Sequence, residues 1–135
     1  MGFTEAVRSV FNKYGDFSGR ASRSEYWFWT LFVMLLFAAG VIVMSVTQTL
    51  LGEIAANIFL GIAAIAGLFL LVIPSLAVSV RRLHDTNSSG WWYLITLVPY
   101  VGGLILFAWF CIKGTVGDNR FGPDPLQGDV AEAFT

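Results

Sequence analysis

The chain has 135 residues and a formal net charge of −1; hydrophobic residues make up 56% of it and charged residues 13%. Soluble domains are typically about 45–50% apolar and about 25% charged, so this composition excludes a soluble globular domain and a disordered chain. The absence of a basic excess excludes a nucleic-acid-binding protein. Three stretches of 27 residues, 26–52, 54–80 and 86–112, contain no charged residue. Each exceeds the roughly 18 apolar residues that indicate a membrane-spanning helix, so the sequence predicts a membrane protein.

Residues 3–14 are predicted to form a short amphipathic helix. Their apolar side chains recur at the spacing of one helix face, and they are Phe3, Val7, Val10, Phe11 and Tyr14. Because this segment precedes an apolar run, we expect it to lie in the membrane interface. The alternative is that it packs on the protein's own polar loops.

The first two apolar helices are predicted over residues 26–47 and 55–79. Ser22 and Glu25 have the spacing of a capping box, so we expect Ser22 to cap the first helix and Glu25 to bond back to Ser22. The second helix contains Pro74, and we expect a kink there because proline removes one backbone hydrogen bond.

The third apolar helix is predicted over residues 91–112, with a break near Pro99–Gly103 because proline and glycine interrupt regular structure. Residues 113–135 are expected to form an irregular tail. The predicted fold is therefore an all-α integral membrane protein with one domain, residues 1–135. It consists of a short N-terminal amphipathic helix and three apolar helices.

The distribution of positive charge predicts a multi-pass protein with a cytoplasmic N-terminus. Four of the eight Lys and Arg residues precede the first apolar helix, and none lies in the connection 48–54. We expect the third run to cross fully and to place the tail outside. Each arm of a re-entrant hairpin would be only about 13 Å long, against a core of about 30 Å, and would have little protein around it. In the alternative, such a hairpin returns the tail to the inside.

Two polar clusters at the ends of the apolar helices are candidate binding sites. They contain Arg20, Arg23, Glu25, Arg81, Arg82, His84 and Asp85. Arginines donate bidentate hydrogen bonds to phosphate or carboxylate, and a neighbouring carboxylate can orient a histidine. Alternatively, the arginines serve only to orient the chain, and the remaining residues form a helix cap and a solvated turn.

A third cluster, residues 118–125, includes Asn119, Arg120 and Asp124. Its acidic residues lack the spacing of an EF-hand, and its composition is typical of turns. The chain has one cysteine and one histidine, which excludes an intramolecular disulfide and a cysteine-based zinc site. No catalytic motif is present. We therefore predict no catalytic residues, no metal and no cofactor.

Three motifs occur in a fixed order around the apolar runs. They are FSGRASRSEYW at 17–27, RRLHD at 81–85 followed by SGWW at 89–92, and GTVGDNRFGPDP at 114–125. In this order the motifs resemble the YhaH/YhaI-like bacterial inner membrane proteins, a family classed as a domain of unknown function. The resemblance covers residues 11–125 and implies the bacterial cytoplasmic membrane, with no assigned activity, substrate or cofactor.

The motif positions also suggest that the loops contact one another. The resemblance implies arginine–carboxylate pairs, with Arg20 or Arg23 bound to Asp85 and Arg120 bound to Asp85 or Asp124. A pair between Arg120 and Asp85 requires the tail to lie on the inside, so the motifs favour the hairpin arrangement.

Three functions are compatible with the sequence. We favour a non-enzymatic membrane protein that forms a homo-oligomer and whose loops bind an anionic lipid headgroup or a protein partner. The alternative is a subunit of a small transporter or channel, although such proteins usually carry a charged residue within a span. The third is a membrane-embedded enzyme that uses His84 and Asp85 on a lipid-linked substrate.

Overall fold

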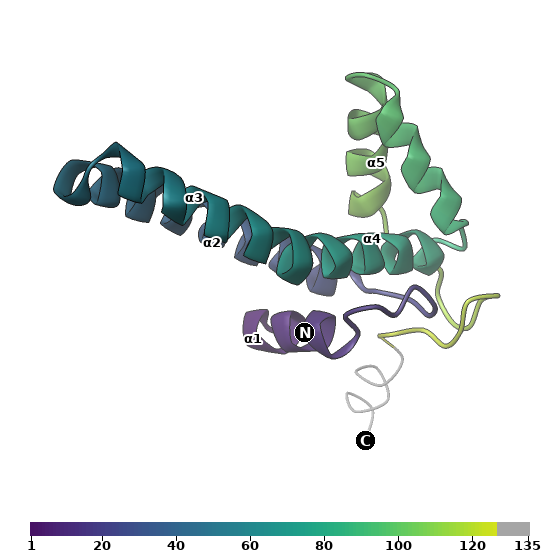
Figure 1. The fold of residues 1–135 in the computed structure, drawn as a ribbon. Helices are drawn as coiled ribbons and strands as arrows, with labels where there is room; N and C mark the ends of the chain where they lie inside the picture. The colour runs from purple at the N-terminus through teal and green to yellow at the C-terminus, as the bar shows by residue number, and fades with distance from the viewer. Residues whose placement is uncertain (127–135) are drawn as a thin grey trace.

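The structure, a computed structural model, describes residues 1–126. Regular structure in this range is helical apart from one isolated bridge between Asn119 and Gly122, which confirms the predicted all-helical fold. Two helical segments, Arg23–Leu51 and Glu53–Asp85, are long and apolar enough to cross a membrane. They lie side by side as a long hairpin, and a shorter helical hairpin stands at a steep angle to it (Figure 1).

The long hairpin begins and reverses at residues suited to these positions. Helix α2 (Arg23–Leu51) begins after Ser22, whose hydroxyl accepts a hydrogen bond from the N–H of Glu25 at 3.3 Å. The helix ends at Gly52, which has a φ of +91° and directly precedes α3 (Glu53–Gly67). A positive φ favours glycine because no Cβ atom meets the backbone there. A single residue therefore reverses the chain.

The returning limb changes its helical register before Pro74. Helix α3 passes into a short π-helix, η1 (Leu68–Val72), and then into α4 (Ile73–Asp85). Proline has no N–H to offer a carbonyl four or five residues earlier. The carbonyl of Phe69 accepts a hydrogen bond from the Tyr14 hydroxyl instead. The wider turn thus lies just before the residue at which a kink was predicted.

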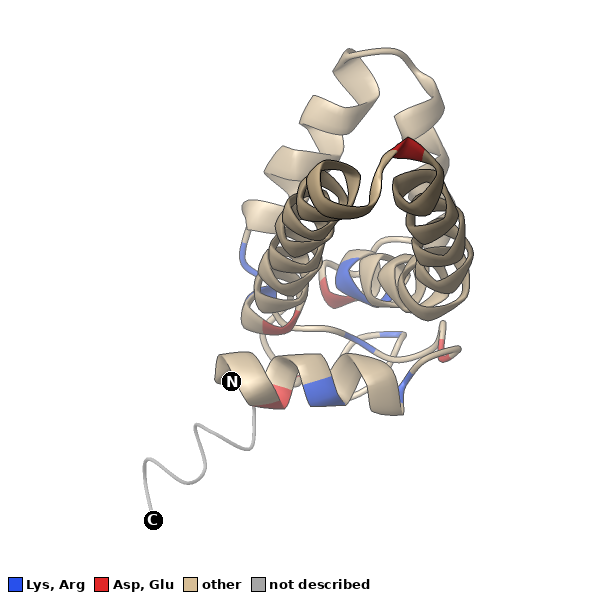
Figure 2. Cartoon of the chain, turned by 60° about the vertical axis from the view of Figure 1, so that its left-hand side comes forward, with Lys and Arg blue, Asp and Glu red and all other residues tan. Residues whose placement is uncertain are grey.

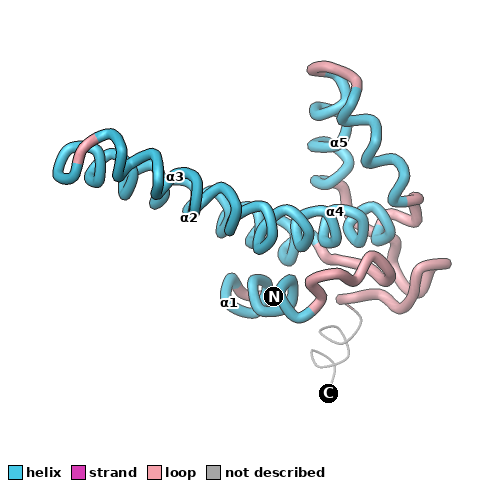
Figure 3. The backbone as a smooth tube through the Cα atoms, in the orientation of Figure 1, coloured by secondary structure: helices cyan, strands magenta, loops and turns pink. Residues whose placement is uncertain are grey.

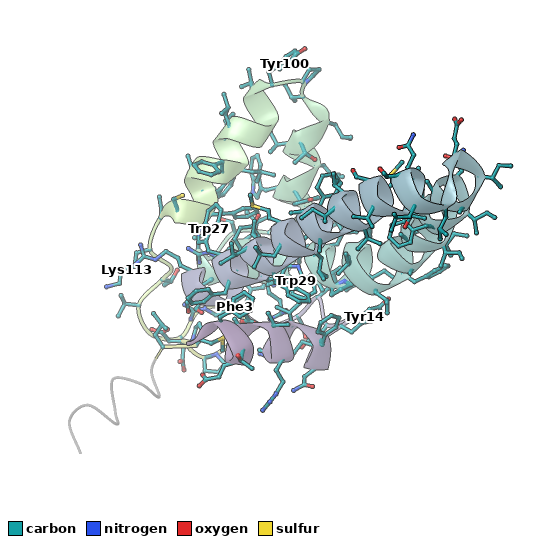
Figure 4. The ribbon with its side chains drawn as sticks, turned by 90° about the vertical axis from the view of Figure 1, so that its left-hand side faces the viewer. Phe3, Tyr14, Trp27, Trp29, Tyr100 and Lys113 are labelled. Atoms are coloured by element: carbon teal, nitrogen blue, oxygen red, sulfur yellow. The ribbon has the colours of Figure 1, made fainter. Side chains whose placement is uncertain are left out.

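Helix α1 (Phe3–Asn12) packs against the base of the long hairpin. Ala6 and Val10 are fully buried, and Val10 packs with Trp29 of α2 and Val78 of α4. Figure 4 shows Trp29 in the space between α1 and the long hairpin. The buried part of its apolar face therefore packs mainly on two apolar helices, with Ala21 of the loop before α2 in the same cluster. Its placement in the membrane interface stays a prediction.

The third apolar run forms the shorter hairpin. Its first arm is a 3₁₀-helix, η2 (Gly90–Leu97), and its second arm is α5 (Val101–Cys111). The chain reverses at Tyr100, which has a φ of +64°, and the N–H of Val101 donates to the carbonyl of Pro99 at 2.7 Å. These are the features of a γ-turn. Gly102 allows the arms to meet, because a Cβ there would lie 1.8 Å from the carbonyl oxygen of Ile95.

The tail returns to the side of the molecule where the third run began. Each arm of the hairpin is roughly 16 Å long, about half the apolar thickness of a bilayer. The N–H of Thr115 then donates to the carbonyl of Asp85 at 2.7 Å. Figure 3 shows the tail beside the loop that connects α1 to α2. Residues 127–135 of the predicted tail lie outside the described residues.

The expectation of three full spans, with the tail on the opposite side from the N-terminal loop, is therefore wrong. It assumed that a short hairpin would find little protein to shelter it. The structure supplies shelter at the base of the hairpin, because Leu106 and Phe110 of α5 pack against Leu83, with Tyr26 and Trp27 alongside. The hairpin is stabilised by this apolar contact.

We predict that Gly102→Ala opens the shorter hairpin, whereas Gly103→Ala does not. The added methyl at position 102 would overlap the Ile95 carbonyl, while a Cβ at Gly103 meets nothing within 4 Å. Overpacking of this kind lowers the free energy of unfolding by about 1–3 kcal/mol. Thermal unfolding in detergent checks this, and equal melting temperatures for the two variants would contradict it.

Candidate functional site

Glu25 is a buried carboxylate that joins three helices. The cap at Ser22 places it in the first turn of α2. Its Oε1 atom accepts a hydrogen bond from Arg81 Nη1 of α4 at 3.0 Å and another from the Ser9 hydroxyl of α1 at 2.9 Å. The expected bond from Glu25 back to Ser22 is therefore replaced by contacts with α1 and α4. Within residues 1–126, the Nε and Nη2 atoms of Arg81 have no hydrogen-bond partner.

Asp85 lies between two arginines at the last turn of α4. Arg82, one helical turn earlier, places Nη1 2.5 Å from Oδ2. Arg20, in the loop before α2, places its guanidinium 3.0 Å from Oδ1. All three side chains are buried. We call Arg20, Glu25, Arg81, Arg82 and Asp85 the buried network; it holds three positive and two negative charges.

Arg20 and Arg82 also bind backbone carbonyls at the end of α5 and in the segment that follows it. Arg82 donates to the carbonyls of Phe110, at 3.3 Å, and Ile112. Arg20 donates to the carbonyls of Thr115, at 2.5 Å, and Gly117, at 2.6 Å. The last carbonyls of a helix have no partner within it, and cations near them are favourable. The buried network thus holds the end of α5 and the start of the tail.

The tail in turn supplies a hydrogen-bond donor to a backbone carbonyl in the last turn of α4. The side-chain amide of Asn119 donates to the carbonyl of His84 at 2.9 Å. The His84 ring is stacked on Phe121, with 3.9 Å between ring centroids and 2° between planes, and its Nδ1 atom donates to the carbonyl of Gly19 at 2.9 Å. His84 therefore connects the end of α4 to both the N-terminal loop and the tail.

Gly114 is the point of closest approach between the tail and α4. A Cβ atom there would lie 2.0 Å from Oδ2 of Asp85 and 2.9 Å from its carbonyl oxygen. Both atoms belong to Asp85, which is held by Arg20 and Arg82, so moving them away would disturb those two ion pairs. Glycine at this position is needed for the tail to reach the buried network.

Two surface carboxylates stabilise the loops in their charged form. Burial by itself raises the pKa of Asp124, but the N–H groups of Leu126 and Gly117, with Arg20 and Lys113 nearby, hold that pKa below its ordinary value. In the N-terminal loop, hydrogen bonds from the Ser18 hydroxyl and N–H lower the pKa of Asp16. Both residues thus act as anionic turn formers.

The structure brings together most of the predicted site residues but changes two of the expected pairs. Arg20 binds Asp85, whereas Arg23 is exposed and donates to the carbonyl of Cys111 at 3.3 Å. Arg120 is not paired with Asp85 or Asp124; it donates to the carbonyl of Asn87 at 3.2 Å and lies over the Phe121 ring. Asp85 already receives two arginines, which leaves its carboxylate no free oxygen.

Several contributing residues were not identified from the sequence. Ser9 lies on a helix whose periodicity indicates only packing, and Lys113 follows an apolar run at no motif position. Gly114 and Phe121 fall inside the third motif, which was the available signal for them.

Figure 2 shows that the charged residues gather around α1 and the nearby helix ends, whereas the long hairpin is nearly free of them.

A polar cleft of about 300 Å³ opens beside the buried network. Its lining includes Ser22, Arg23 and Ser24 at the start of α2, together with Lys113 and Thr115 of the tail. Arg23 and Lys113 are exposed, and neither has a carboxylate within 4.0 Å among residues 1–126. Asp85 and Asp124 also line the cleft. The arrangement presents two free cations and several hydroxyl groups to a ligand.

The chemistry of these groups suits binding of an anion. In the described part of the chain, no three His, Cys, Asp or Glu side chains are grouped in a way that could hold a metal ion. Arg23 can donate two parallel hydrogen bonds to a phosphate, and Lys113 can add a point charge.

Comparison with known protein families finds a match to the sequence. The model described as "Protein of unknown function (DUF805)" matches residues 14–123. The chain belongs to the DUF805 family. This confirms the resemblance seen in the three motifs, all of which lie within or next to the matched range.

Two relatives from Escherichia coli K12 cover most of the chain. The inner membrane protein YhaI is 43% identical over 89% of this chain and 94% of its own length. The inner membrane protein YhaH is 42% identical over 86% and 92%. A third, the uncharacterized protein YiiR, is 31% identical over 73% of this chain and 60% of its own length. No solved structure shows significant similarity to the chain.

We predict that Asp85→Asn releases the tail. The substitution leaves Arg20 and Arg82 buried without their counter-ion, and breaking a buried pair in this way lowers the free energy of unfolding by about 3–5 kcal/mol. Thermal unfolding should show the loss, and trypsin should cut faster after Lys113. Asp118→Asn, at an exposed position, is the control. Wild-type cleavage rates in Asp85→Asn would contradict the role assigned to Asp85.

Proposed function

We propose that this protein is a non-enzymatic inner membrane protein that binds the headgroup of an anionic lipid in the polar cleft. The inner membrane location follows the names of the relatives YhaI and YhaH. The observation that carries the function is the position of Arg23 and Lys113. Two exposed cations line one cleft at the end of the apolar helices, where phosphate groups of a bilayer would lie.

We infer a cytoplasmic location for the cleft. The N-terminal segment, the end of α4 and the tail lie together in the structure, and these segments contain all eight Lys and Arg residues. The turn between α2 and α3, at the other end of the long hairpin, has none. The positive-inside rule therefore supports two membrane crossings with the first and last segments inside.

The net charge around the cleft favours an anion. The cations are the two that line it and the two that bind Asp85, namely Arg20, Arg23, Arg82 and Lys113. The carboxylates of Asp85 and Asp124 contribute two negative charges. A net charge of +2 attracts a phosphate without requiring any buried pair to break.

The buried network has a positioning role in this proposal. Its three arginines were candidates for binding the anion directly. Arg20 and Arg82 instead donate to Asp85 and to backbone carbonyls. Arg81 is buried and donates to Glu25. By holding the end of α5 and the tail, Arg20 and Arg82 place Lys113 beside the same cleft as Arg23. The ligand is thus bound by residues outside the network, and the network sets their spacing.

His84 and Asp85 are poorly arranged for acid–base catalysis. The ring of His84 is buried under Phe121 and bonded to the N-terminal loop, and Asp85 is bound by two arginines. These contacts support a structural role for both residues, which favours binding over an enzymatic function.

The double variant Arg23→Gln with Lys113→Gln tests the lipid site. We expect its affinity for phosphatidylglycerol, measured by native mass spectrometry of the detergent-purified protein, to fall about tenfold or more. A hydrogen bond to a charged group contributes about 1.5–3 kcal/mol, and tenfold corresponds to about 1.4 kcal/mol.

The matched control is Arg8→Gln with Lys13→Gln, which removes the same charge from exposed positions in and after α1. It should bind phosphatidylglycerol as the wild type does. Equal losses in the two variants would mean that only net charge matters, and the cleft would then have no specific role.

Thiol labelling tests the orientation. In a Cys111→Ser background, Glu53→Cys marks the turn between the long helices and Asp118→Cys marks the tail; both positions are exposed. We expect an impermeant reagent to label position 53 in intact spheroplasts and position 118 only after lysis. Labelling of position 118 in intact spheroplasts would overturn the proposed cytoplasmic cleft.

A further inference from the structure

A second hollow continues from the polar cleft along the first turns of α2. It is an open groove of about 570 Å³, lined by Arg23, Ser24, Trp27, Phe28, Leu31 and Cys111. Arg23 and Ser24 line both the cleft and the groove. The two hollows therefore form one surface, polar at one end and apolar at the other.

We propose that the cleft and the groove together bind one intact phospholipid, with its phosphate at Arg23 and Lys113 and an acyl chain along the groove. This inference rests on the proposed function and deepens it. The cleft alone would accept any small phosphate. The groove makes the acyl chain part of what is recognised.

The order of the lining residues along α2 supports this occupant. Ser24, Trp27, Phe28 and Leu31 follow the spacing i, i+3, i+4 and i+7, so they lie on one face of the helix. From Ser24 to Leu31 this face extends about 10 Å. Its polar end meets the cleft and its apolar end points along α2 into the long hairpin. A lipid has the same order, from charged headgroup to apolar chain.

The walls of the groove come from two elements that the buried network holds together. Trp27 of α2 contacts Phe107 of α5, with ring centroids 5.4 Å apart, and Cys111 ends α5. Arg82 binds the carbonyls of Phe110 and Ile112 on either side of Cys111. Figure 4 shows Trp27 and Lys113 on the same side of the molecule. The chain-binding and phosphate-binding ends are thus parts of one arrangement.

The experiment compares a whole lipid with its soluble headgroup on the full-length protein in detergent. The probes are phosphatidylglycerol with two long acyl chains and sn-glycerol 3-phosphate, which has the phosphate without a chain. Native mass spectrometry measures both. We expect phosphatidylglycerol to bind at least tenfold more tightly, and Leu31→Trp, which fills the groove, to weaken only phosphatidylglycerol, by about tenfold.

The matched control is Ile42→Trp, at an exposed position of α2 that does not line the groove. It should leave both affinities unchanged. Equal binding of the two probes, or a Leu31→Trp variant that binds phosphatidylglycerol as the wild type does, would overturn the acyl-chain site. In either case a loss in the Arg23/Lys113 double variant would still support the proposed function.

Protection of Cys111 supplies a second measurement that needs no substitution in the groove. Cys111 is exposed and is the single cysteine of the chain. We expect phosphatidylglycerol to slow its reaction with a maleimide severalfold, and sn-glycerol 3-phosphate to leave the rate unchanged. Unchanged rates with the lipid would overturn the inference. Loss of protection in the Arg23/Lys113 double variant would show that the phosphate end positions the chain.

Discussion

A carboxylate buried away from water requires compensating donors, and the loops of this protein are arranged around that requirement at Asp85. The side chain is 6% exposed, and it receives hydrogen bonds from Arg20 in the N-terminal loop and from Arg82 in its own helix. Two arginines bring more donors than one carboxylate can accept. The surplus donors bind the carbonyls of Phe110, Ile112, Thr115 and Gly117. One buried charge thus determines where the end of α5 and the tail must lie.

The same requirement explains why the third apolar run forms a hairpin. A full crossing would carry Ile112 and Thr115 to the far side of the membrane, where Arg20 and Arg82 could not reach them. The γ-turn at Tyr100 and the close approach at Gly102 reverse the chain within a short distance. Apolar contacts of Leu106 and Phe110 with Leu83 then hold the hairpin against the long helices. Electrostatics and packing therefore favour the same arrangement.

The division between buried and exposed cations connects this architecture to the proposed function. A buried pair contributes less to stability than its geometry suggests, because desolvation offsets much of the attraction. The main effect of such a pair here is to define a single arrangement of the loops. Arg23 and Lys113 remain in contact with solvent and border the cleft. In this proposal they bind the phosphate, and the buried network keeps them at the spacing that a lipid requires.

The sequence alone determined the membrane class, the all-helical fold, the capping role of Ser22 and the three motifs that identify the family. These properties depend on local composition and periodicity, which a linear pattern records. The prediction that Arg20 pairs with Asp85 came from the motifs, whereas the roles of Ser9, Lys113 and Gly114 did not. The tertiary structure was needed to show that the third run folds back, that Arg23 stays exposed and that Glu25 binds Arg81. The Glu25–Arg81 pair joins residues more than 50 positions apart in the chain. The hairpin depends on shelter supplied by packing. Such long-range contacts leave no signal in the local sequence.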